Sequence, residues 1–327
     1  MIKNKNRIVK TYAIHPYKRY TKKQPMKYLP LFLIAIGFSI TLSSCTSSDD
    51  EITTDNTTVI IDEPALEAVV FTDVSYGDDP QQVYDLYLPE GRTTDATKVV
   101  VLIHGGGWTS GDKSDMAPTV AFMQTFHPDH AILNVNYALA ALPNTPAFPN
   151  QYVDIQTIIN QVTEQREELH ILPEFGMIGA SAGAHLAMMY DYVYDTNDQV
   201  KFVIDIVGPS DFTDPFYAND PNFSIALSVF VDESQFPEGT DYAVANSPAF
   251  QVTASSSPTL LFYGNQDPLV PLTNGMRLDS SLNTSNIDHL FTVYQGGHGN
   301  DWSEESTLDL ALKSSEYIDT YLPIVIQ

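Results

Sequence analysis

Short apolar, β-branched runs recur along the chain from about residue 65, and each has the length of a β-strand. One of them, residues 98–103 (KVVVLI), is almost continuously apolar, as expected of a strand that is buried on both faces. The predicted strands are residues 69–76, 83–88, 98–103, 131–137, 175–178, 202–207, 259–263 and 289–294.

Stretches with helical spacing of apolar residues lie between or after the later strands, at residues 152–169, 182–194 and 308–321. Strands that alternate with helices predict an α/β fold with a mostly parallel central sheet and helices on both faces. The first two strands are joined by a short turn, residues 77–80 (GDDP), which predicts an antiparallel pair at the edge of the sheet.

The N-terminal segment has a different pattern, because an uncharged apolar run, residues 28–42, follows Lys27. This run has the length of a signal-peptide core and is short for a membrane-spanning helix. Residues 42–45 (LSSC) resemble the lipobox of bacterial lipoproteins. The resemblance implies that residues 1–45 are a signal peptide ending in the lipobox, and that Cys45 carries a lipid anchor. The alternative is a free cysteine at the end of a membrane helix.

Met26 by itself can begin an ordinary signal peptide, so Met26 is an alternative start. Residues 46–64 are rich in Ser, Thr, Asp and Asn, which is typical of a flexible acidic tether, and residues 65–327 are then expected to form one domain. Residues 48–51 (SDDE) resemble the export signal of Bacteroidetes-type surface lipoproteins. We therefore expect a cell-envelope protein, lipid-anchored to the outer membrane through Cys45 only, at the periplasmic face or the cell surface.

Charge is divided unevenly between these two parts. The chain of 327 residues has 16 Lys and Arg against 41 Asp and Glu, and nine of the basic residues but no acidic residue precede Cys45. Seven basic and 41 acidic residues remain from residue 46 onward, a formal charge of about −34. Such an acidic surface repels phosphate backbones, which excludes nucleic acid as a partner, and it predicts a preference for neutral over polyanionic substrates.

Ser181 lies in residues 179–183 (GASAG), a G-x-S-x-G sequence that follows one predicted strand and opens a predicted helix. Small residues let the chain turn sharply and expose the Ser181 hydroxyl, while the helix N-terminus favours developing negative charge. By itself the sequence could equally be a plain turn. In this context it makes Ser181 the candidate nucleophile.

A glycine-rich loop, residues 104–108 (HGGGW), follows the most apolar predicted strand. Acyl transfer places negative charge on a carbonyl oxygen, and a backbone without side chains can bring N–H groups close to that oxygen. We expect the N–H groups of Gly106, Gly107 and Ala182 to form the oxyanion hole. His104 is expected to fix the loop by hydrogen bonding rather than to transfer protons.

Asp267 and His298 each lie just past a later predicted strand. A serine nucleophile needs a histidine to accept its proton, and this histidine needs a carboxylate to hold its tautomer. The chain order Ser181, Asp267, His298 is that of α/β-hydrolases. We predict that these residues form a catalytic triad, with Asp211, which also follows a strand, as the competing acid.

The other histidines are weaker candidates. His185, four residues after Ser181, is expected to be a packed helix residue. No metal site is expected, because the domain has no cysteine and no metal-ligand spacing occurs at His127, His130, His170 and His289. No phosphate-loop or dinucleotide fingerprint occurs, so no cofactor is expected either. Three aromatic residues close to the motifs are candidates to line the acyl pocket: Trp108, Tyr137 and Trp302.

Together these motifs resemble the esterase/lipase family of α/β-hydrolases with an HGGGW oxyanion loop, and most closely its bacterial feruloyl-esterase-like and acetyl-xylan-esterase-like branch. The resemblance runs from about Tyr76 to His298. Besides the Asp267 and His298 loops it includes residues 84–89 (YDLYLP), 104–108 (HGGGW), 110–113 (SGDK), 136–137 (NY), 148–149 (FP) with Asp154, and 179–187 (GASAGAHLA). The chain departs from it at Ala138, where many relatives carry an arginine.

The resemblance implies a serine carboxylic-ester hydrolase that removes acetyl or feruloyl groups from carbohydrate esters through an acyl-enzyme. A lipase or peptidase-like hydrolase of the same fold is one alternative, although no long apolar lid is evident in residues 211–250. A surface lipoprotein that binds glycan without turnover is an alternative of another class. Such a protein would lack a triad or oxyanion member, and none is missing here. The sequence does not indicate the oligomeric state.

Overall fold

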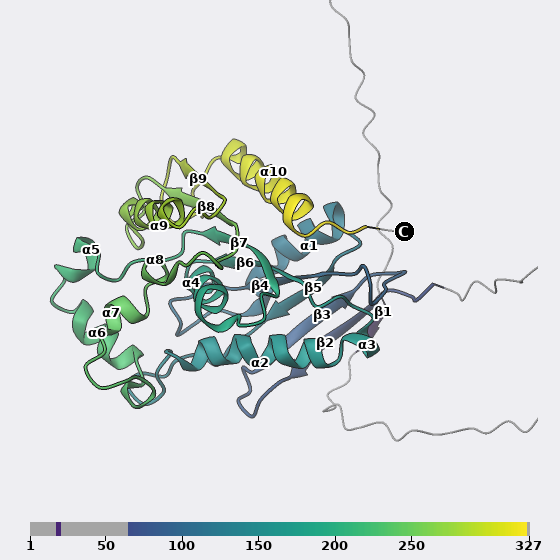
Figure 1. Ribbon diagram of the computed structural model, residues 1–327, viewed down its shortest axis with the longest axis horizontal. Helices are drawn as coiled ribbons and strands as arrows, with labels where there is room; N and C mark the ends of the chain where they lie inside the picture. Colours follow the sequence, from purple (N-terminus) through teal and green to yellow (C-terminus); the bar gives the residue numbers. More distant parts are fainter. Residues whose placement is uncertain (1–17, 21–64, 326–327) are drawn as a thin grey trace, which may run out of the picture.

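The structure is a computed structural model that describes residues 18–20 and 65–325. Among these residues, nine strands form one sheet with the order β1-β2-β3-β5-β4-β6-β7-β8-β9 (Figure 1). The strands are β1 (Lys18–Tyr20), β2 (Val69–Ser75), β3 (Val83–Leu88), β4 (Val99–Ile103), β5 (Ala131–Val135), β6 (Phe175–Ala180), β7 (Val200–Ile206), β8 (Thr259–Gly264) and β9 (His289–Tyr294).

The sheet is mostly parallel, as predicted. Strand β3 runs antiparallel to both of its neighbours, β2 and β5, and the other paired strands run parallel. The antiparallel pairing expected of the first two predicted strands is therefore confirmed. Strand β1, which comes from the segment predicted to be a signal peptide, pairs with the outer side of β2.

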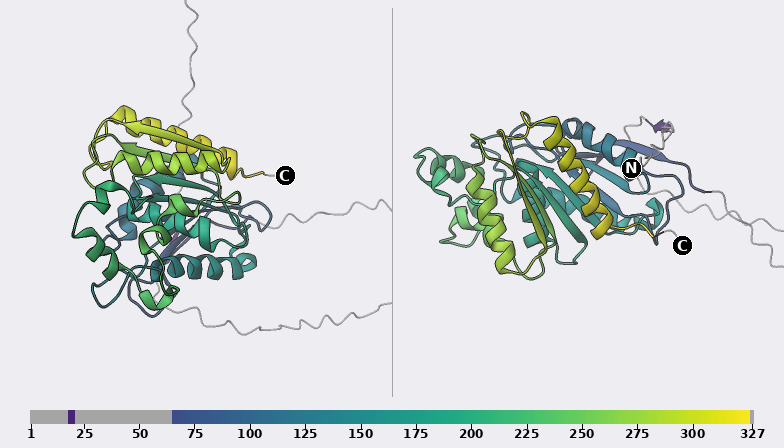
Figure 2. Two further views of the ribbon diagram at one scale, coloured as in Figure 1. Left: turned by 60° about the vertical axis from the view of Figure 1, so that its left-hand side comes forward. Right: turned by 90° about the horizontal axis from the view of Figure 1, so that it is seen from above.

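Helices cover both faces of the sheet. They are α1 (Ala117–Phe126), α2 (Asn150–Glu164), α3 (Arg166–Leu169), α4 (Ala182–Met189), α5 (Pro215–Ala218), α6 (Phe223–Phe230), α7 (Tyr242–Ala245), α8 (Pro248–Gln251), α9 (Leu272–Thr284) and α10 (Glu304–Tyr321). Helices α1 and α10 pack on one face, and α2, α4 and α9 pack on the other (Figures 1 and 2).

The two faces have separate hydrophobic cores, and the central strand β4 contributes to both. Val99, Val101 and Ile103 pack in the core that contains α2, α4 and α9. Val100 and Leu102 pack in the core that contains α1 and α10. This alternation follows from the two-residue period of a strand, and each fully buried aliphatic side chain stabilises the fold by about 1.5–3 kcal/mol. The strand that leads into the glycine-rich loop is thus fixed from both sides.

The predicted helices exist, with different bounds. The predicted helix 152–169 is interrupted at Gln165, between α2 and α3. The predicted helix 182–194 consists of α4 and a π-helical turn, Tyr190–Tyr194. Helix α10 begins before residue 308, because the Ser303 hydroxyl caps its N-terminus by accepting a hydrogen bond from Ser306 N.

The sequence did not predict α1, α9 or a cap segment, defined here as residues 212–252, which contains α5 to α8. The cap segment lies at one end of the sheet, on the left in Figure 1. Its helices have only four to eight residues, too few to show a helical period. Three of its acidic residues accept hydrogen bonds from helix or 3₁₀-turn N–H groups: Asp214, Asp232 and Asp241.

Cys45, the tether 46–64 and all of the predicted signal peptide apart from β1 lie outside the described residues. Among the described residues, no helix is both long enough and apolar enough to cross a membrane.

Candidate active site

Ser181 lies at the sharp turn between β6 and α4. Its φ of 53° is positive, a backbone conformation that a residue with a side chain adopts at a cost. The flanking glycines allow this turn. A Cβ at Gly179 would lie 2.4 Å from Ala184 Cα, and a Cβ at Gly183 would lie 2.1 Å from the carbonyl oxygen of Ile103. The G-x-S-x-G spacing is therefore required by backbone contacts at both glycines.

The structure brings Ser181, His298 and Asp267 together. His298 Nε2 lies 2.8 Å from Ser181 Oγ, and His298 Nδ1 lies 2.6 Å from Asp267 Oδ2. The carboxylate accepts a hydrogen bond from the Nδ1–H group, so Nε2 carries no proton and can accept the proton of the serine hydroxyl. Three segments that are far apart in the chain thus form one continuous hydrogen-bonded chain.

Asp267 is held in its ionised form by its loop. Its side chain is fully buried, and its Oδ1 accepts hydrogen bonds from Leu269 N at 2.8 Å and Val270 N at 3.0 Å. Burial acts to raise the pKa of Asp267, but the hydrogen bonds from His298 and these two N–H groups outweigh it and hold the pKa below its usual value. The carboxylate can therefore fix the orientation of His298.

The loop that carries His298 is braced by two residues that follow it. Gly297 N donates a hydrogen bond to Asp301 Oδ1 at 2.8 Å, and Trp302 Nε1 donates one to the Gly297 carbonyl oxygen at 3.1 Å. The loop also packs directly on the end of β8, where a Cβ at Gly264 would lie 2.0 Å from the Gly297 carbonyl oxygen. Trp302 supports the His298 loop through this indole N–H and packs on Tyr294.

The glycine-rich loop lies against the serine turn. A Cβ at Gly105 would lie 3.0 Å from the Ala180 carbonyl oxygen and 3.2 Å from Ser181 Cβ. Gly106 and Gly107 have φ values of 120° and 57°, in the region that favours glycine. The loop therefore approaches the candidate nucleophile closely by means of backbone alone.

His104 contacts the backbone of this loop through its buried side chain. It is fully buried, its Nδ1 lies 2.6 Å from the Gly105 carbonyl oxygen, and its ring stacks on Tyr137 at a centroid distance of 4.5 Å. Burial lowers the pKa of His104. The interpretation of Tyr137 as a pocket-lining residue is wrong, because Tyr137 is completely buried and its hydroxyl donates a hydrogen bond to the His104 carbonyl oxygen.

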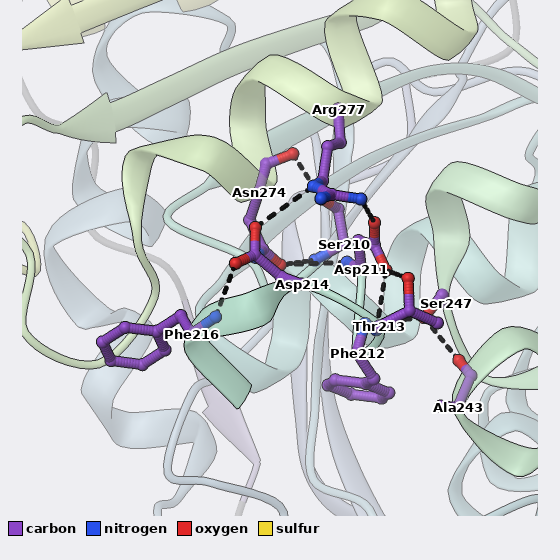
Figure 3. A network of polar contacts seen from close by, with 10 residues as sticks. All are labelled: Ser210, Asp211, Phe212, Thr213, Asp214, Phe216, Ala243, Ser247, Asn274 and Arg277. Carbon is purple, nitrogen blue, oxygen red and sulfur yellow. Dashed lines mark hydrogen bonds and ion pairs between the residues drawn. The ribbon is translucent and has the colours of Figure 1, made fainter. Parts of the chain in front are cut away.

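Asp211, the competing acid, is engaged elsewhere. Its Oδ2 lies 2.7 Å from Arg277 Nη1, and its Oδ1 accepts hydrogen bonds from the N–H and the hydroxyl of Thr213. Asp214 binds the same guanidinium at 3.2 Å (Figure 3). Both oxygens of Asp211 are thus taken by Arg277 and Thr213, and the carboxylate in contact with His298 is that of Asp267.

The remaining histidines of the domain lie in other hydrogen-bonded or structural positions. His127, His130 and His289 contact Ser315 Oγ, the Leu322 carbonyl oxygen and the Ile287 carbonyl oxygen, respectively. His170 ends α3 with a positive φ. Among residues 65–325, no three His, Cys, Asp or Glu side chains are grouped so that they could hold a metal ion.

The aromatic surroundings of Trp108, the last residue of the HGGGW loop, were not predicted from the sequence. The indole packs edge-on against Phe148, Phe212 and Phe230, which come from three separate segments, and against His185. The only sequence signal was the richness in aromatic residues, which does not show which rings meet.

The chain is similar to known proteins in sequence. The profile of the BD-FAE family matches residues 84–282. Esterase LipC of Mycobacterium tuberculosis is 23% identical over 211 residues, which are 61% of this chain and 51% of that protein. The chain thus spans about half the length of this curated relative.

Two solved structures have a similar fold. One is a truncated carbohydrate esterase from gut microbiota, with a TM-score of 0.63 and 20% identity over 77% of this chain and 96% of that one. The other is esterase Est2 of Thermogutta terrifontis, with a TM-score of 0.63 and 18% identity over 80% and 94%. The predicted α/β-hydrolase fold is confirmed. Because the family match covers more than half of the chain, including Gly106, Ser181 and Asp267, this protein belongs to the BD-FAE family.

Proposed function

We propose that this protein is a serine carboxylic-ester hydrolase that works through an acyl-enzyme. The observation that carries the proposal is the hydrogen-bonded chain from Asp267 through His298 to Ser181, beside a loop with a glycine backbone. The family and the esterase relatives support the same reaction class.

In the first half-reaction, Ser181 Oγ attacks the carbonyl carbon of the ester while its proton passes to His298 Nε2. The N–H groups of Gly106, Gly107 and Ala182 stabilise the oxygen that becomes negative, and Asp267 stabilises the imidazolium. His298 then gives the proton to the leaving alcohol oxygen, and the acyl group stays on Ser181.

In the second half-reaction, water attacks the acyl carbon while His298 accepts one of its protons. The tetrahedral intermediate collapses, His298 returns the proton to Ser181 Oγ, and the carboxylic acid leaves. The proton transfers between Ser181 and His298 use groups that already lie within hydrogen-bond distance of each other, so the proposal requires no large rearrangement of the triad.

We further propose that the substrates are neutral acetylated or feruloylated carbohydrates. The similar fold of a gut-microbiota carbohydrate esterase supports this substrate class. The pairing of the two basic residues nearest in the sequence to the glycine-rich loop and the Asp267 loop supports a neutral substrate. Lys113 and Arg277, which follow the glycine-rich loop and the Asp267 loop, are each paired with two carboxylates. Neither cation is free to bind an anionic sugar.

Turnover of p-nitrophenyl acetate by the purified protein tests the reaction class. Ser181→Ala should abolish turnover and labelling by a fluorophosphonate, which reacts only with an activated serine. Ser234→Ala, which changes an exposed serine of the cap segment, serves as the matched control and should change neither. A Ser181→Ala variant with full activity would overturn the assignment, and an unlabelled wild type would favour glycan binding without turnover.

A second candidate, hydrolysis of longer acyl esters, is favoured by apolar side chains on and beside the cap segment. Phe216, Ile225 and Leu269 are 48%, 66% and 60% exposed. A panel of p-nitrophenyl esters with acyl chains of increasing length separates the candidates. Highest kcat/KM on acetate supports the carbohydrate esterase, and highest kcat/KM on long chains supports the lipase-like enzyme.

We also propose attachment to the cell envelope through lipidated Cys45, supported by the sequence of residues 28–45. In a bacterial host, Cys45→Ser should abolish incorporation of a radiolabelled fatty acid and move the protein out of the membrane fraction. Equal incorporation into both forms would contradict the anchor.

A further inference from the structure

Trp108 adopts a backbone conformation that side chains rarely adopt. Its φ is 62°, and it directly follows Gly106 and Gly107, whose φ values are also positive. Three consecutive left-handed residues thus set the path of the glycine-rich loop. A tryptophan held in this region carries strain, which persists only where surrounding contacts enforce it.

Several contacts enforce this conformation. The Trp108 carbonyl oxygen accepts hydrogen bonds from Gln151 Nε2 at 2.8 Å and from Ala140 N at 2.9 Å. The indole packs among three phenylalanine rings, at centroid distances of 5.3 to 5.9 Å. Its single polar atom, Nε1, donates a hydrogen bond to His185 Nδ1 at 3.3 Å.

His185 connects this tryptophan to the helix of the candidate nucleophile. It lies on the first turn of α4, where its N–H donates to the Ser181 carbonyl oxygen at 3.1 Å. Its side chain is fully buried, and Nε2 lies 2.8 Å from the Asn246 carbonyl oxygen.

The hydrogen-bond partners of His185 determine which nitrogen of its imidazole ring carries the proton. An indole N–H can only donate and a carbonyl oxygen can only accept, so Nδ1 is the bare nitrogen of His185 and Nε2 carries the proton. Burial lowers the pKa of His185 to about 4, although the bond to Asn246 acts to raise it. The ring is therefore neutral at physiological pH, with one fixed tautomer.

We propose that His185 and Trp108 are positioning residues that fix the N–H groups of Gly106 and Gly107 relative to Ser181. This inference rests on the proposed esterase reaction. The contact Asn246–His185–Trp108 ties the glycine-rich loop to the nucleophile helix, so the two halves of the oxyanion hole keep a constant separation. Neither side chain contacts the triad through a hydrogen bond in the described residues.

The expected signature is a loss in kcat with little change in KM. The N–H groups of an oxyanion hole act mainly on the negative oxygen of the transition state, so their displacement affects the chemical step more than substrate binding. Removal of one such donor costs roughly 10²- to 10³-fold in kcat in other serine hydrolases. Displacement of the loop should therefore cost roughly 10- to 100-fold.

Two substitutions of His185 separate its two hydrogen bonds. His185→Gln can still donate to the Asn246 carbonyl oxygen but offers no acceptor at the position of Nδ1. His185→Asn keeps an acceptor near that position and gives up the bond to Asn246. We expect kcat to fall roughly 10- to 100-fold in His185→Gln and only about threefold in His185→Asn. Trp108→Phe should behave as His185→Gln does, and the double variant should lose no more than either single one.

A purely structural role predicts a different result. Tyr152→Phe serves as the control, because the Tyr152 hydroxyl donates to Asn246 Oδ1 in the same buried cluster but does not contact the indole N–H. Tyr152→Phe should lower the Tm. It should not lower the kcat per labelled serine, which is the turnover rate divided by the concentration of protein whose Ser181 reacts with the fluorophosphonate. Unchanged kcat per labelled serine in His185→Gln, or losses that multiply in the double variant, would overturn the inference.

A readout without turnover keeps the inference separate from the proposed reaction. The chain has only two tryptophans, so the indole ¹⁵N–¹H signal of Trp108 is identified by its loss in Trp108→Phe. This signal and the amide signals of Gly106 and Gly107 should shift in His185→Gln and largely return in His185→Asn. Unshifted signals would overturn the inference, whereas a wild type without turnover would overturn only the reaction.

Discussion

Asp205 is fully buried, and its Oδ2 lies 2.7 Å from the hydroxyl oxygen of Tyr263. The same hydroxyl lies 2.5 Å from the carbonyl oxygen of Gly208. A phenol has one proton to donate, so both contacts can be full hydrogen bonds only if Asp205 is protonated and donates to Tyr263. Asp205 pairs in register with Gly179, two residues before Ser181, so this proton lies in the sheet beneath the serine turn.

This pair predicts a pH-dependent contribution to stability. Burial raises the pKa of Asp205 to about 7, although the hydrogen bonds that its ionised form would accept from the Tyr263 hydroxyl and the Gly208 N–H act to lower it. The pKa of an unfolded aspartate is about 3.9, so the folded state holds the proton more tightly, and the contribution present below pH 4 is lost as the pH rises toward 7. Asp205→Asn removes this loss and keeps an N–H group that can donate to Tyr263.

Urea unfolding at pH 5 and pH 8 measures the effect. Relative to wild type, Asp205→Asn should gain roughly 2–3 kcal/mol more in the free energy of unfolding at pH 8 than at pH 5. Comparison with wild type at each pH removes the contributions of other groups, such as Asp191, whose pKa burial also raises to about 7. An equal difference at both pH values would mean that Asp205 is ionised throughout.

The contact between His298 and Asp267 predicts a large loss of turnover in Asp267→Asn. An amide at this position lets His298 adopt the wrong tautomer, and the corresponding change in another serine hydrolase lowers kcat about 10⁴-fold. We expect a loss of at least about 10³-fold in kcat for p-nitrophenyl acetate. Asp211→Asn is the matched control and should stay within about tenfold of wild type. The reverse order would make Asp211 the catalytic acid.

The backbone path at Gly106 predicts that alanine is not tolerated there. Its φ is 120°, and an added Cβ would lie 1.9 Å from the Ser110 carbonyl oxygen. The loop must shift to relieve this contact, so Gly106→Ala should lower kcat roughly 10²-fold. Gly239→Ala is the control, because Gly239 also has a positive φ, of 82°, but a Cβ there meets nothing within 4 Å. Equal kcat values in the two variants would contradict the role of the loop.

Arg277 pairs with both Asp211 and Asp214, so its removal should lower the free energy of unfolding. These carboxylates are 1% and 2% exposed, and Arg277 is the side chain that pairs with both (Figure 3). Breaking a buried pair from one side costs about 3–5 kcal/mol, and because Arg277 is partly exposed we expect about 2–3 kcal/mol for Arg277→Met. Thermal unfolding measures the loss, and changing both aspartates to asparagine in the same variant should recover part of it.

The acidity of the chain predicts discrimination between substrates of different charge. At low ionic strength the protein should release acetate more slowly from acetylated pectin, a polyanion, than from acetylated neutral xylan, because its net negative charge repels uronates. The difference should shrink as salt is added, since salt screens this repulsion. Equal rates at low salt would show that net charge has no influence on substrate choice.

Local patterns in the sequence determined the strands, their alternation with helices and the loops that carry the candidate chemistry. Residues 83–88 and 289–294 are strands with the predicted bounds. Strand period and apolar content are properties of neighbouring residues, so they can be read without the fold. Because parallel strands end at one edge of a sheet, the order Ser181, Asp267, His298 also predicted that these side chains meet.

Only the tertiary structure decided which groups touch. It placed Asp267 rather than Asp211 against His298, because Arg277 and Thr213 occupy both oxygens of Asp211. It also buried Tyr137 beneath the glycine-rich loop. It assembled the cap segment from helices too short to have a visible period. These outcomes depend on distances between residues that are remote in the chain, and no local pattern of apolar and polar positions contains those distances.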